Sequence, residues 1–302
     1  MLFGGLVATI ETAEGPPALR VALQHLAGAD HESLLAGTGK VTEQDGVHLF
    51  HGADLTAGFA LARAGLDLEA ATEDLYRRLF AATDGLHLHR IWNYVPHINR
   101  LETTLENYRR FCRARSLAFE TRLGRDFKSL LPASSAVGAS AGPLAVAFVA
   151  GSTPGRHFEN PRQVPAFDYP PEHGPRPPSF SRATVAGAGG FAHVFISGTA
   201  AIRGHATVAP GVLEPQLECT LDNLRLIGAV AGVGPALGSD GSWERRFKVY
   251  LRQPDDLDRV VSRLESELLR PHDHVVYLHA DVCRAELVVE IEATLSRRQG
   301  AG

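Results

Sequence analysis

The stretch from residue 277 to residue 294, YLHADVCRAELVVEIEAT, decides how we interpret the rest of the chain. Two apolar, alternating segments are joined by the polar turn CRAE, a pattern that predicts a β-hairpin. Because side chains alternate across a strand, Val289 and Ile291 face one way and Glu290 faces the other. If helices cover the first face, Glu290 points into whatever the other face of the sheet encloses.

Two interpretations of Glu290 follow from this pattern. In the first, the strand lies at the edge of a sheet, and Glu290 and Glu292 form a solvated acidic face. In the second, Glu290 is half-buried and desolvation raises its pKa, which suits a carboxyl that donates a proton. The strand alone leaves both interpretations open.

The bulk composition is that of a globular protein. With 302 residues, 44% hydrophobic and 21% charged, the chain is long enough for two domains of about 150 residues each. The formal charge of −4 argues against a general nucleic-acid or membrane-surface binder, and no segment predicts a membrane helix. Cys112, Cys219 and Cys283 lie far apart, which fits a reducing cytoplasm better than a disulfide scaffold. We interpret residues 2–10 as a first strand and not as a signal peptide.

Both halves of the chain show the order β-α-β-α-β, which predicts a diverged duplication in an α+β protein. In each half a helix leads to an aromatic-bearing strand, RIWNYVP or FKVYLRQP, that stops at a proline before a second helix. Two sheets, each with helices on one face, would bring their bare faces together and enclose a site. We expect domains at residues 1–151 and 183–302, joined by residues 152–182. Helices are predicted near residues 67–85, 101–123, 215–230 and 255–269, and the small-residue stretch LPASSAVGASAG is predicted to be a loop.

The connecting segment 152–182 contains eight prolines and four arginines. One interpretation is an inter-domain linker, since proline-rich linkers are common. We favour a second, in which the segment holds a ligand, because it also carries aromatic side chains and because long loops inside compact proteins are usually functional. Its planar guanidinium groups are suited to pairing with the carboxylates of a small polyanion.

Few short motifs point to a particular chemistry. The sequence has no P-loop for nucleotide phosphates, and His272, His274, His279 and Asp281 lack the spacing of a known metal motif, so we interpret them as structural or solvent-facing. The strand FISGTA ends in small residues that include Gly198, as expected where a ligand approaches the backbone or where the chain turns.

Several stretches together resemble the chorismatase family across nearly the whole chain. They are RIWNYVPHIN, LPASSAVG, NPRQVPAFDYP, GPRPPSFSRA, FISGTAAIRGH, QLECTLDNLRLI, KVYLR, YLHADVCR and LVVEIEA. The resemblance implies two fused YjgF-like (chorismate-mutase-like) domains, which agrees with the duplication. It also implies cleavage of the enolpyruvyl ether of chorismate, with release of pyruvate and with no metal or organic cofactor.

The resemblance further implies roles for individual residues. Glu290 corresponds to the family's general acid, which protonates the enolpyruvyl methylene, and this role agrees with the second interpretation of the strand. Cys283 stands where the hydroxybenzoate-forming members carry a cysteine, which favours 3-hydroxybenzoate as the product, with or without 4-hydroxybenzoate. The expected substrate-binding residues are Arg162, Tyr169, Arg176, Arg182, Gly198, Thr199, Ala200 and Lys248.

Two residues depart from the expected pattern, Ala200 from that of the hydroxybenzoate formers and His173 from that of the family. Ala200 is more similar to the subfamily that hydrolyses chorismate to a dihydrodiol, and His173 stands where a tyrosine is usual. Hydrolysis is therefore the alternative outcome. Two further alternatives are an imine deaminase of the YjgF type and a non-catalytic carboxylate-binding module. We expect a cytoplasmic protein that binds chorismate and neither nucleic acid nor membranes; monomer and homo-oligomer both stay open.

Overall fold

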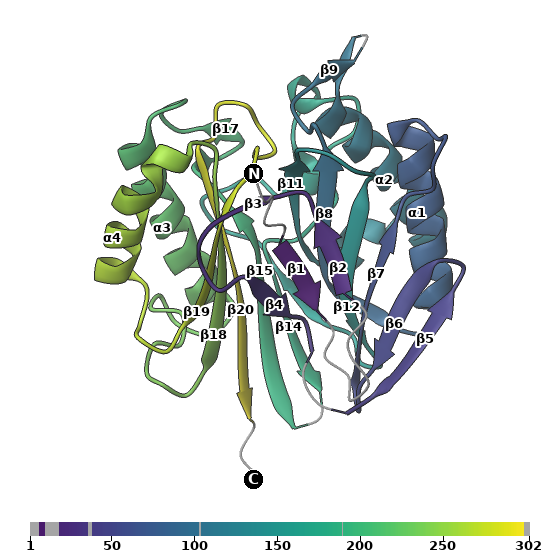
Figure 1. Cartoon of the computed structure of the whole chain (residues 1–302), viewed down its shortest axis with the longest axis horizontal. Coiled ribbons are helices and arrows are strands. Elements are labelled where there is room, and N and C mark those ends of the chain that lie inside the picture. Colours follow the sequence, from purple (N-terminus) through teal and green to yellow (C-terminus); the bar gives the residue numbers. More distant parts are fainter. Residues whose placement is uncertain (1–5, 10–17, 36–37, 103, 189, 299–302) are drawn as a thin grey trace.

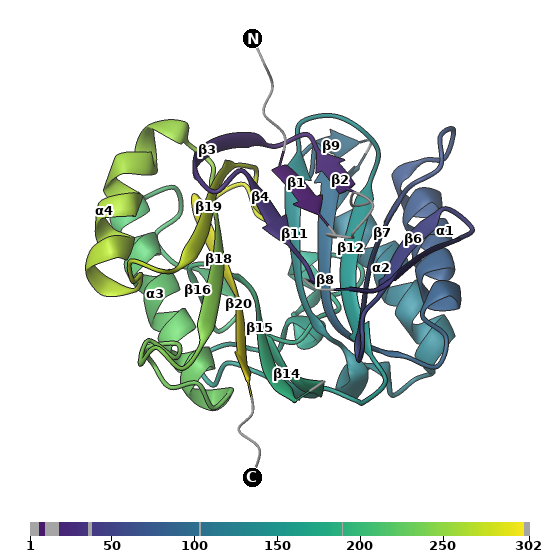
Figure 2. The same ribbon diagram turned by 60° about the horizontal axis from the view of Figure 1, so that its bottom comes forward.

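A computed structural model of the chain describes residues 6–9, 18–35, 38–102, 104–188 and 190–298. Two large sheets face each other at the centre of the molecule, and the long helices cover their outer faces, α1 and α2 on one side and α3 and α4 on the other (Figures 1 and 2). The predicted α+β class, with helices on one face of each of two sheets, is confirmed.

The first sheet has the strand order β11-β8-β12-β7-β6-β5. Its strands are β5 (Lys40–Gln44), β6 (Val47–His51), β7 (Leu55–Leu61), β8 (His87–Pro96), β11 (Ala133–Ala139) and β12 (Ala145–Gly151). Its helices are α1 (Leu68–Ala82) and α2 (Asn107–Leu123).

The second sheet has the order β13-β14-β15-β20-β18-β19-β3, so β3 from the first part of the chain completes its edge. Its strands are β3 (Gln24–Gly28), β13 (Arg156–Phe158), β14 (Ala183–Ala188), β15 (Phe191–Thr199), β18 (Glu244–Leu251), β19 (His274–His279) and β20 (Val289–Arg298). Its helices are α3 (Leu213–Val230) and α4 (Leu257–Glu267). Smaller pairings join β1 (Leu6–Thr9) to β2 (Ala18–Val21) and β4 (His31–Ser33), β9 (Leu101–Glu102) to β10 (Leu105–Glu106), and β16 (Ile202–Arg203) to β17 (Ala206–Thr207).

The strand pairings support the duplication. The order β11-β8-β12-β7-β6 of the first unit matches β19-β18-β20-β15-β14 of the second. The first pair is parallel and the others are antiparallel in both units. Each unit thus has two strands more than the predicted β-α-β-α-β repeat, because a pair of strands precedes the first helix and two strands follow the second helix.

The predicted terminal hairpin is wrong. β19 and β20 are both strands, but β18 lies between them, parallel to β19 and antiparallel to β20. Residues 280–288 therefore cross over β18 as a loop instead of forming a tight turn. Alternation along the sequence identified the strands, but it does not reveal which neighbour each strand pairs with.

Two further predictions in the first half are also wrong. The stretch LPASSAVGASAG contains β11, a buried strand beside β8, where small side chains let the second unit approach closely. Gly138 N donates to Asp281 O, for example, at 2.8 Å. The helix expected from residue 101 begins at Asn107, because β9 and β10 form a short hairpin first. By contrast, Asp67 caps α1 as predicted, accepting from the backbone N–H groups of Glu69 and Ala70.

The apolar core is divided by the two sheets. One cluster packs α1 and α2 onto the first sheet, and another packs α3 and α4 onto the second. A third cluster fills the space between the sheets and includes Trp92, Val149 and Tyr250. The inner faces therefore meet as predicted, and polar side chains that lie between them are removed from water. Among the described helices, none is long and apolar enough to cross a membrane.

Candidate active site

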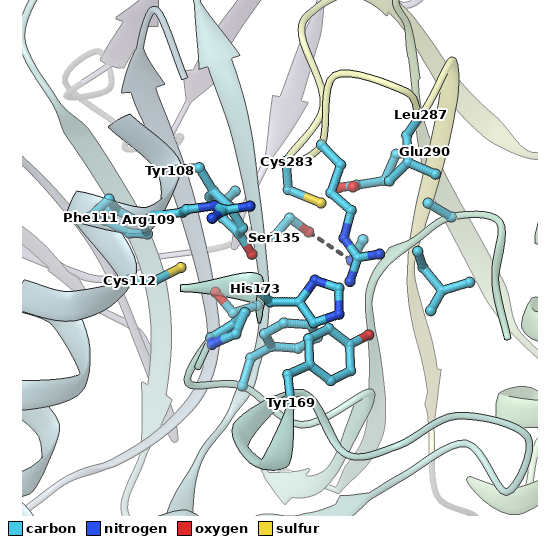
Figure 3. A pocket seen from close by; sticks show the side chains of 18 of the residues that line it. Tyr108, Arg109, Phe111, Cys112, Ser135, Tyr169, His173, Cys283, Leu287 and Glu290 are labelled. Atoms are coloured by element: carbon cyan, nitrogen blue, oxygen red, sulfur yellow. Dashed lines mark hydrogen bonds between the residues drawn. The ribbon is translucent and has the colours of Figure 1, made fainter. Parts of the chain in front are cut away.

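A pocket lies where the two units meet at one end of the sheets (Figure 3). Its wall is formed by α2, β11, the connecting segment, the end of β15, the loop 280–288 and β20. It leaves about 170 Å³ into which the centres of water-sized molecules fit. The pocket therefore draws on both units and on the segment that joins them.

Glu290 projects from β20 into this pocket. β20 is paired on both sides, with β15 and β18, so the solvated-edge interpretation is wrong. The residue is 3% exposed, and its Oε1 has no hydrogen-bond partner among the described residues. Burial and then the negative charge of Glu292 raise the pKa of Glu290 to about 8, although Arg90 and Arg182 act in the opposite direction. The carboxyl is therefore mostly protonated at neutral pH.

Gly198 makes room for this carboxyl. A Cβ atom at position 198 would lie 2.0 Å from Glu290 Oε1, closer than any real contact. The Gly198 N–H donates to the hydroxyl oxygen of Ser135 at 2.9 Å. Glycine is thus needed here because a side chain would displace the acid from its place.

Glu292, two residues along β20, is held as an anion. Its burial alone would raise its pKa, but Lys248 and Arg90 lower the pKa of Glu292 below its ordinary value. Lys248 Nζ lies 2.8 Å from Oε1 and Arg90 Nη2 lies 2.7 Å from Oε2. Trp92 Nε1 donates to Oε1 at 2.6 Å, and the Ser135 hydroxyl donates to Oε2. Three of these four partners come from the first unit, so the contact between the units fixes the charge that acts on Glu290.

Arginines without a carboxylate partner surround the pocket. Arg115 is buried and donates to the neutral oxygens of Tyr76, Ser134 and Ser179. Arg284 donates to the hydroxyl of Thr207. In the part of the chain that the structure describes, no ion pair joins either arginine to a carboxylate. Their uncompensated charge favours an anionic ligand.

Arg182 is the member of the connecting segment that reaches the pocket. Its Nη2 donates to the Tyr169 hydroxyl at 2.8 Å, and its guanidinium packs on the ring of Phe180. Glu159 lies 3.9 Å from its Nε, but burial raises the pKa of Glu159 to about 7. Neutralisation of Arg182 by Glu159 is therefore incomplete near neutral pH.

Cys283, in the loop 280–288, lies beside Glu290 of β20 (Figure 3). Burial and then the charge of Glu290 raise the pKa of the Cys283 thiol to about 12. The sulfur is therefore a neutral thiol and not a nucleophilic thiolate near neutral pH.

The structure brings together most of the residues selected from the sequence. Glu290, Cys283, Tyr169, Arg182, Gly198 and Ala200 line one pocket. Thr199 is adjacent, but its hydroxyl donates to the Ser197 carbonyl. Lys248 lies deeper, between Glu292 and Glu32, and contacts the acid's neighbour instead of the cavity.

The other two selected arginines lie outside the pocket lining. Arg162 is half-exposed and lies 3.8 Å from Asp222, and Arg176 donates to Glu120 at 2.6 Å. All three arginines belong to the same connecting segment, and residue type alone did not separate them.

Several lining residues were not selected from the sequence, namely Tyr108, Arg115, Ser134, Ser135 and Arg284; His173, also in the lining, was noted only as a departure from the family pattern. The two serines belong to the strand that was predicted to be a loop. Arg115 lies on the same buried face of α2 as Cys112 and Phe119. A charged side chain on an otherwise apolar helix face was the one signal in the sequence that could have identified it.

Two other sequence features take no part in the pocket. His279 Nδ1 contacts Gln24, and Asp281 pairs with Arg252, so these members of the C-terminal histidine group do not converge. Gly138–Gly142 matches GxSxG by letter, but Ser140 is exposed and donates to the Ala22 carbonyl. No histidine of the described residues bonds its hydroxyl, so it is not an activated nucleophile.

Comparisons with known proteins agree with this architecture. The family model described as chorismatase FkbO/Hyg5-like, N-terminal, matches residues 34–150. A 3-hydroxybenzoate synthase from Streptomyces hygroscopicus is 40% identical over 218 residues, which are 68% of this chain and 62% of that protein, less than two thirds of its length. A chorismatase from Streptomyces rapamycinicus is 34% identical over 95% of this chain and 89% of its own length.

A crystal structure of a chorismatase superposes on almost the whole chain. The TM-score is 0.77 at 29% identity, with 95% of this chain and 89% of that one covered. The similarity thus extends over both units and the segment between them. On the identity and coverage of these relatives, the chain belongs to the chorismatase family.

Proposed function

We propose that this protein cleaves the enolpyruvyl ether of chorismate and releases pyruvate and 3-hydroxybenzoate. One observation carries the proposal: a buried, protonated carboxyl, that of Glu290, faces a pocket bordered by arginines that lack carboxylate partners. A relative that is 40% identical is a 3-hydroxybenzoate synthase, which supports the choice of product.

The first chemical step is transfer of the Glu290 proton to the methylene carbon of the enolpyruvyl group. The new C–H bond uses the electron pair of the double bond, so positive charge develops on the ether-bearing carbon. A general acid works best when its pKa lies near the working pH, and a pKa of about 8 meets this condition. Glu292, two residues further along β20, assists because its negative charge opposes ionisation of Glu290 in the free enzyme.

Arg182, Arg115 and Arg284 suit the two carboxylates of the substrate. Arg182 and Tyr169 approach the pocket from the connecting segment, Arg115 from α2 and Arg284 from the loop 280–288. Guanidinium groups bind carboxylates through two parallel hydrogen bonds, which fixes orientation as well as charge. Gly198 and Ala200 contribute small residues to the wall of the pocket. Arg162, Arg176, Thr199 and Lys248 contribute indirectly in this arrangement, from the neighbourhood of the pocket.

The product depends on what attacks after protonation. When the neighbouring ring hydroxyl takes part internally, chorismate yields pyruvate and a hydroxybenzoate without consuming water. When water attacks, one water is consumed and the products are pyruvate and a dihydrodiol. Cys283 favours the first outcome, because a neutral thiol in the wall is a poor hydrogen-bond partner for an attacking water. Ala200 in the lining is the observation that keeps hydrolysis as the second candidate.

We also infer how the chain is divided. Residues 1–151 and 183–302 form the two YjgF-like domains, and residues 152–182 contribute to the site. The first domain supplies Arg115, the connecting segment supplies Arg182 and the second domain supplies Glu290. The free thiols of Cys112, Cys219 and Cys283 fit a working place in the reducing cytoplasm.

The decisive experiment is incubation of the purified protein with chorismate, with pyruvate measured enzymatically and aromatic products separated by chromatography. We expect equal amounts of pyruvate and 3-hydroxybenzoate. Pyruvate with the dihydrodiol would establish the hydrolytic alternative. Tight binding of chorismate without pyruvate release would reject catalysis and leave a carboxylate-binding protein.

A further inference from the structure

Glu172, His173 and His205 bring three metal-ligating atoms together at the edge of the pocket. His173 Nε2 lies 3.0 Å from His205 Nδ1. Glu172 Oε1 lies 3.6 Å from the first nitrogen and 3.4 Å from the second. The three atoms thus form a nearly equilateral triangle, built from two adjacent residues and a third that lies 32 residues further along the chain.

The size of this triangle matches the needs of a tetrahedral ion. Zn²⁺ binds histidine nitrogen and carboxylate oxygen at about 2.0–2.1 Å, which places tetrahedral ligand atoms about 3.4 Å apart. The observed separations of 3.0, 3.4 and 3.6 Å scatter around that value. Two imidazoles and one carboxylate are ligands typical of Zn²⁺ and neighbouring transition metals, whereas Mg²⁺ and Ca²⁺ prefer all-oxygen sites.

Backbone hydrogen bonds hold both ligand-bearing turns in place. Glu172 and His173 belong to a single 3-10 turn, Pro171–His173, in which the His173 N–H donates to the Pro170 carbonyl at 3.1 Å. His205 follows Gly204 in the turn between β16 and β17, where φ at Gly204 is +60°.

The second turn is also bound to the connecting segment. Gly204 N–H donates to the Arg162 carbonyl at 2.8 Å, and Val164 N–H donates back to the Gly204 carbonyl at 2.9 Å. The triangle is therefore assembled before any ion arrives, so little ordering entropy opposes binding.

We propose that Glu172, His173 and His205 bind a transition-metal ion such as Zn²⁺, and that the bound ion restricts entry to the pocket. His173 lines the pocket and its ring packs 5.2 Å from that of Tyr169, the residue that contacts Arg182 (Figure 3). An ion on this triangle ties the connecting segment to the β16–β17 hairpin beside the opening. The site is regulatory and supplies nothing to the proton transfer.

The surrounding charges oppose tight binding of a cation. Arg284 and Arg109 act electrostatically on His173 and repel a cation, while Glu172 attracts it. Three protein ligands leave at least one coordination position for water or an anion, in contrast to a closed structural site with four protein ligands.

The binding test does not involve substrate and does not depend on the proposed function. Metal-free protein without a polyhistidine tag is titrated with Zn²⁺ by calorimetry, and with Co²⁺ by its visible absorption; Mg²⁺ is the negative probe. We expect one Zn²⁺ per chain and no heat with Mg²⁺. His205→Ala and Glu172→Gln should each weaken Zn²⁺ binding on the order of tenfold to a hundredfold or more, since the loss of even an outer partner costs that much.

A matched control separates this site from histidines in general. His272→Ala removes an exposed histidine of the C-terminal group and should leave Zn²⁺ affinity unchanged. Circular dichroism checks that each variant is folded, and Glu172→Gln is the safer of the two because Glu172 is exposed. Absence of one-to-one binding, or equal affinity in His205→Ala and the wild-type protein, would overturn the site.

The effect on the pocket rests on the proposed function and is measured separately. Zn²⁺ should lower kcat/KM for chorismate in the wild-type protein, chelator should restore it, and His205→Ala should be insensitive. Zn²⁺ binding with unchanged kinetics would overturn the restriction of entry while the site itself stands. Lack of any turnover without metal would instead reject the proposed function.

Discussion

The two units have the same strand order, but their equivalent inner strands carry opposite chemistry. β12 in the first unit presents Ala145, Ala147 and Val149 to the other sheet, all within the apolar cluster between the units. β20, its counterpart in the second unit, presents Glu290 and Glu292. Backbone pairing is the same in both places, so hydrogen bonding did not constrain what faces inward.

The difference shows which side chains each unit contributes to the site. The second unit supplies the acid and the neighbouring anion, and the first supplies Arg90, Trp92 and Ser135, which hold that anion. Neither unit alone has a neutral carboxyl beside a fixed charge. The site exists because the two bare faces meet.

The largest effect should come from the residue that distinguishes β20 most. Glu290→Gln keeps the shape of the side chain but removes its transferable proton, so kcat should fall on the order of 10²- to 10⁴-fold. Pyruvate release is the measurement. Glu244→Gln, on the exposed end of β18, is the matched control and should retain activity. An active Glu290→Gln enzyme would show that the acid lies elsewhere.

Removing the neighbouring anion should mainly affect stability. Glu292→Gln leaves the buried Lys248 and Arg90 without their common partner, and breaking such a buried pair costs about 3–5 kcal/mol. The free energy of unfolding in urea measures this loss, again with Glu244→Gln as the reference. If the two variants are equally stable, the inter-unit charge cluster contributes nothing.

A methyl group at position 198 should affect both stability and turnover. The Cβ of Gly198→Ala would overlap the Glu290 carboxyl, and overpacking of this kind typically costs about 1–3 kcal/mol. The counterpart in the first unit is Gly58→Ala, whose Cβ would meet the Phe148 ring at 2.5 Å. Both variants should unfold earlier, but only Gly198→Ala should lose activity per folded molecule. Equal specific activities would mean that the acid tolerates displacement.

The pH profile tests the protonation state of the acid. Only neutral Glu290 donates, and its folded-state pKa is raised to about 8. Activity is therefore present below that value, and kcat/KM should fall about tenfold for each pH unit above it. Ser135→Ala removes one hydrogen bond from Glu292 and provides a milder perturbation of the same cluster. A profile that is flat from about pH 7 to pH 9.5 would contradict a raised pKa of the proton donor.

The smallest effect on rate should come from Cys283→Ala, which should change products instead. Loss of the thiol opens space beside Glu290 in which water can lie, so the fraction of dihydrodiol should rise while pyruvate release changes little. Cys219→Ala, which removes a buried thiol on α3 outside the pocket lining, is the comparison for a general packing effect. An unchanged product ratio would assign Cys283 a purely structural role.

Much of this organisation was predictable from local sequence. Alternation along residues 287–293 placed Glu290 opposite the helix-facing residues, and the repeated helix-to-strand pattern predicted two sheets with bare inner faces. Resemblance to a family then implied that Glu290 is the general acid. The two main failures have different causes. β11 was missed because its small side chains show no apolar period, and the hairpin prediction failed because β18 lies between two strands that are neighbours in sequence.

The sequence by itself determined the four long helices, several of the strands, their repetition, and the presence of a carboxyl in an apolar strand, because these follow from periodicity and composition over short distances. Only the tertiary structure decided that Glu290 is protonated and Glu292 ionised. Two identical side chains on one strand acquire different charges because burial acts on both, whereas Lys248 and Arg90 form ion pairs with Glu292. It likewise selected Arg182 over Arg162 and Arg176, since reaching the pocket depends on how the connecting segment packs and not on its residue types.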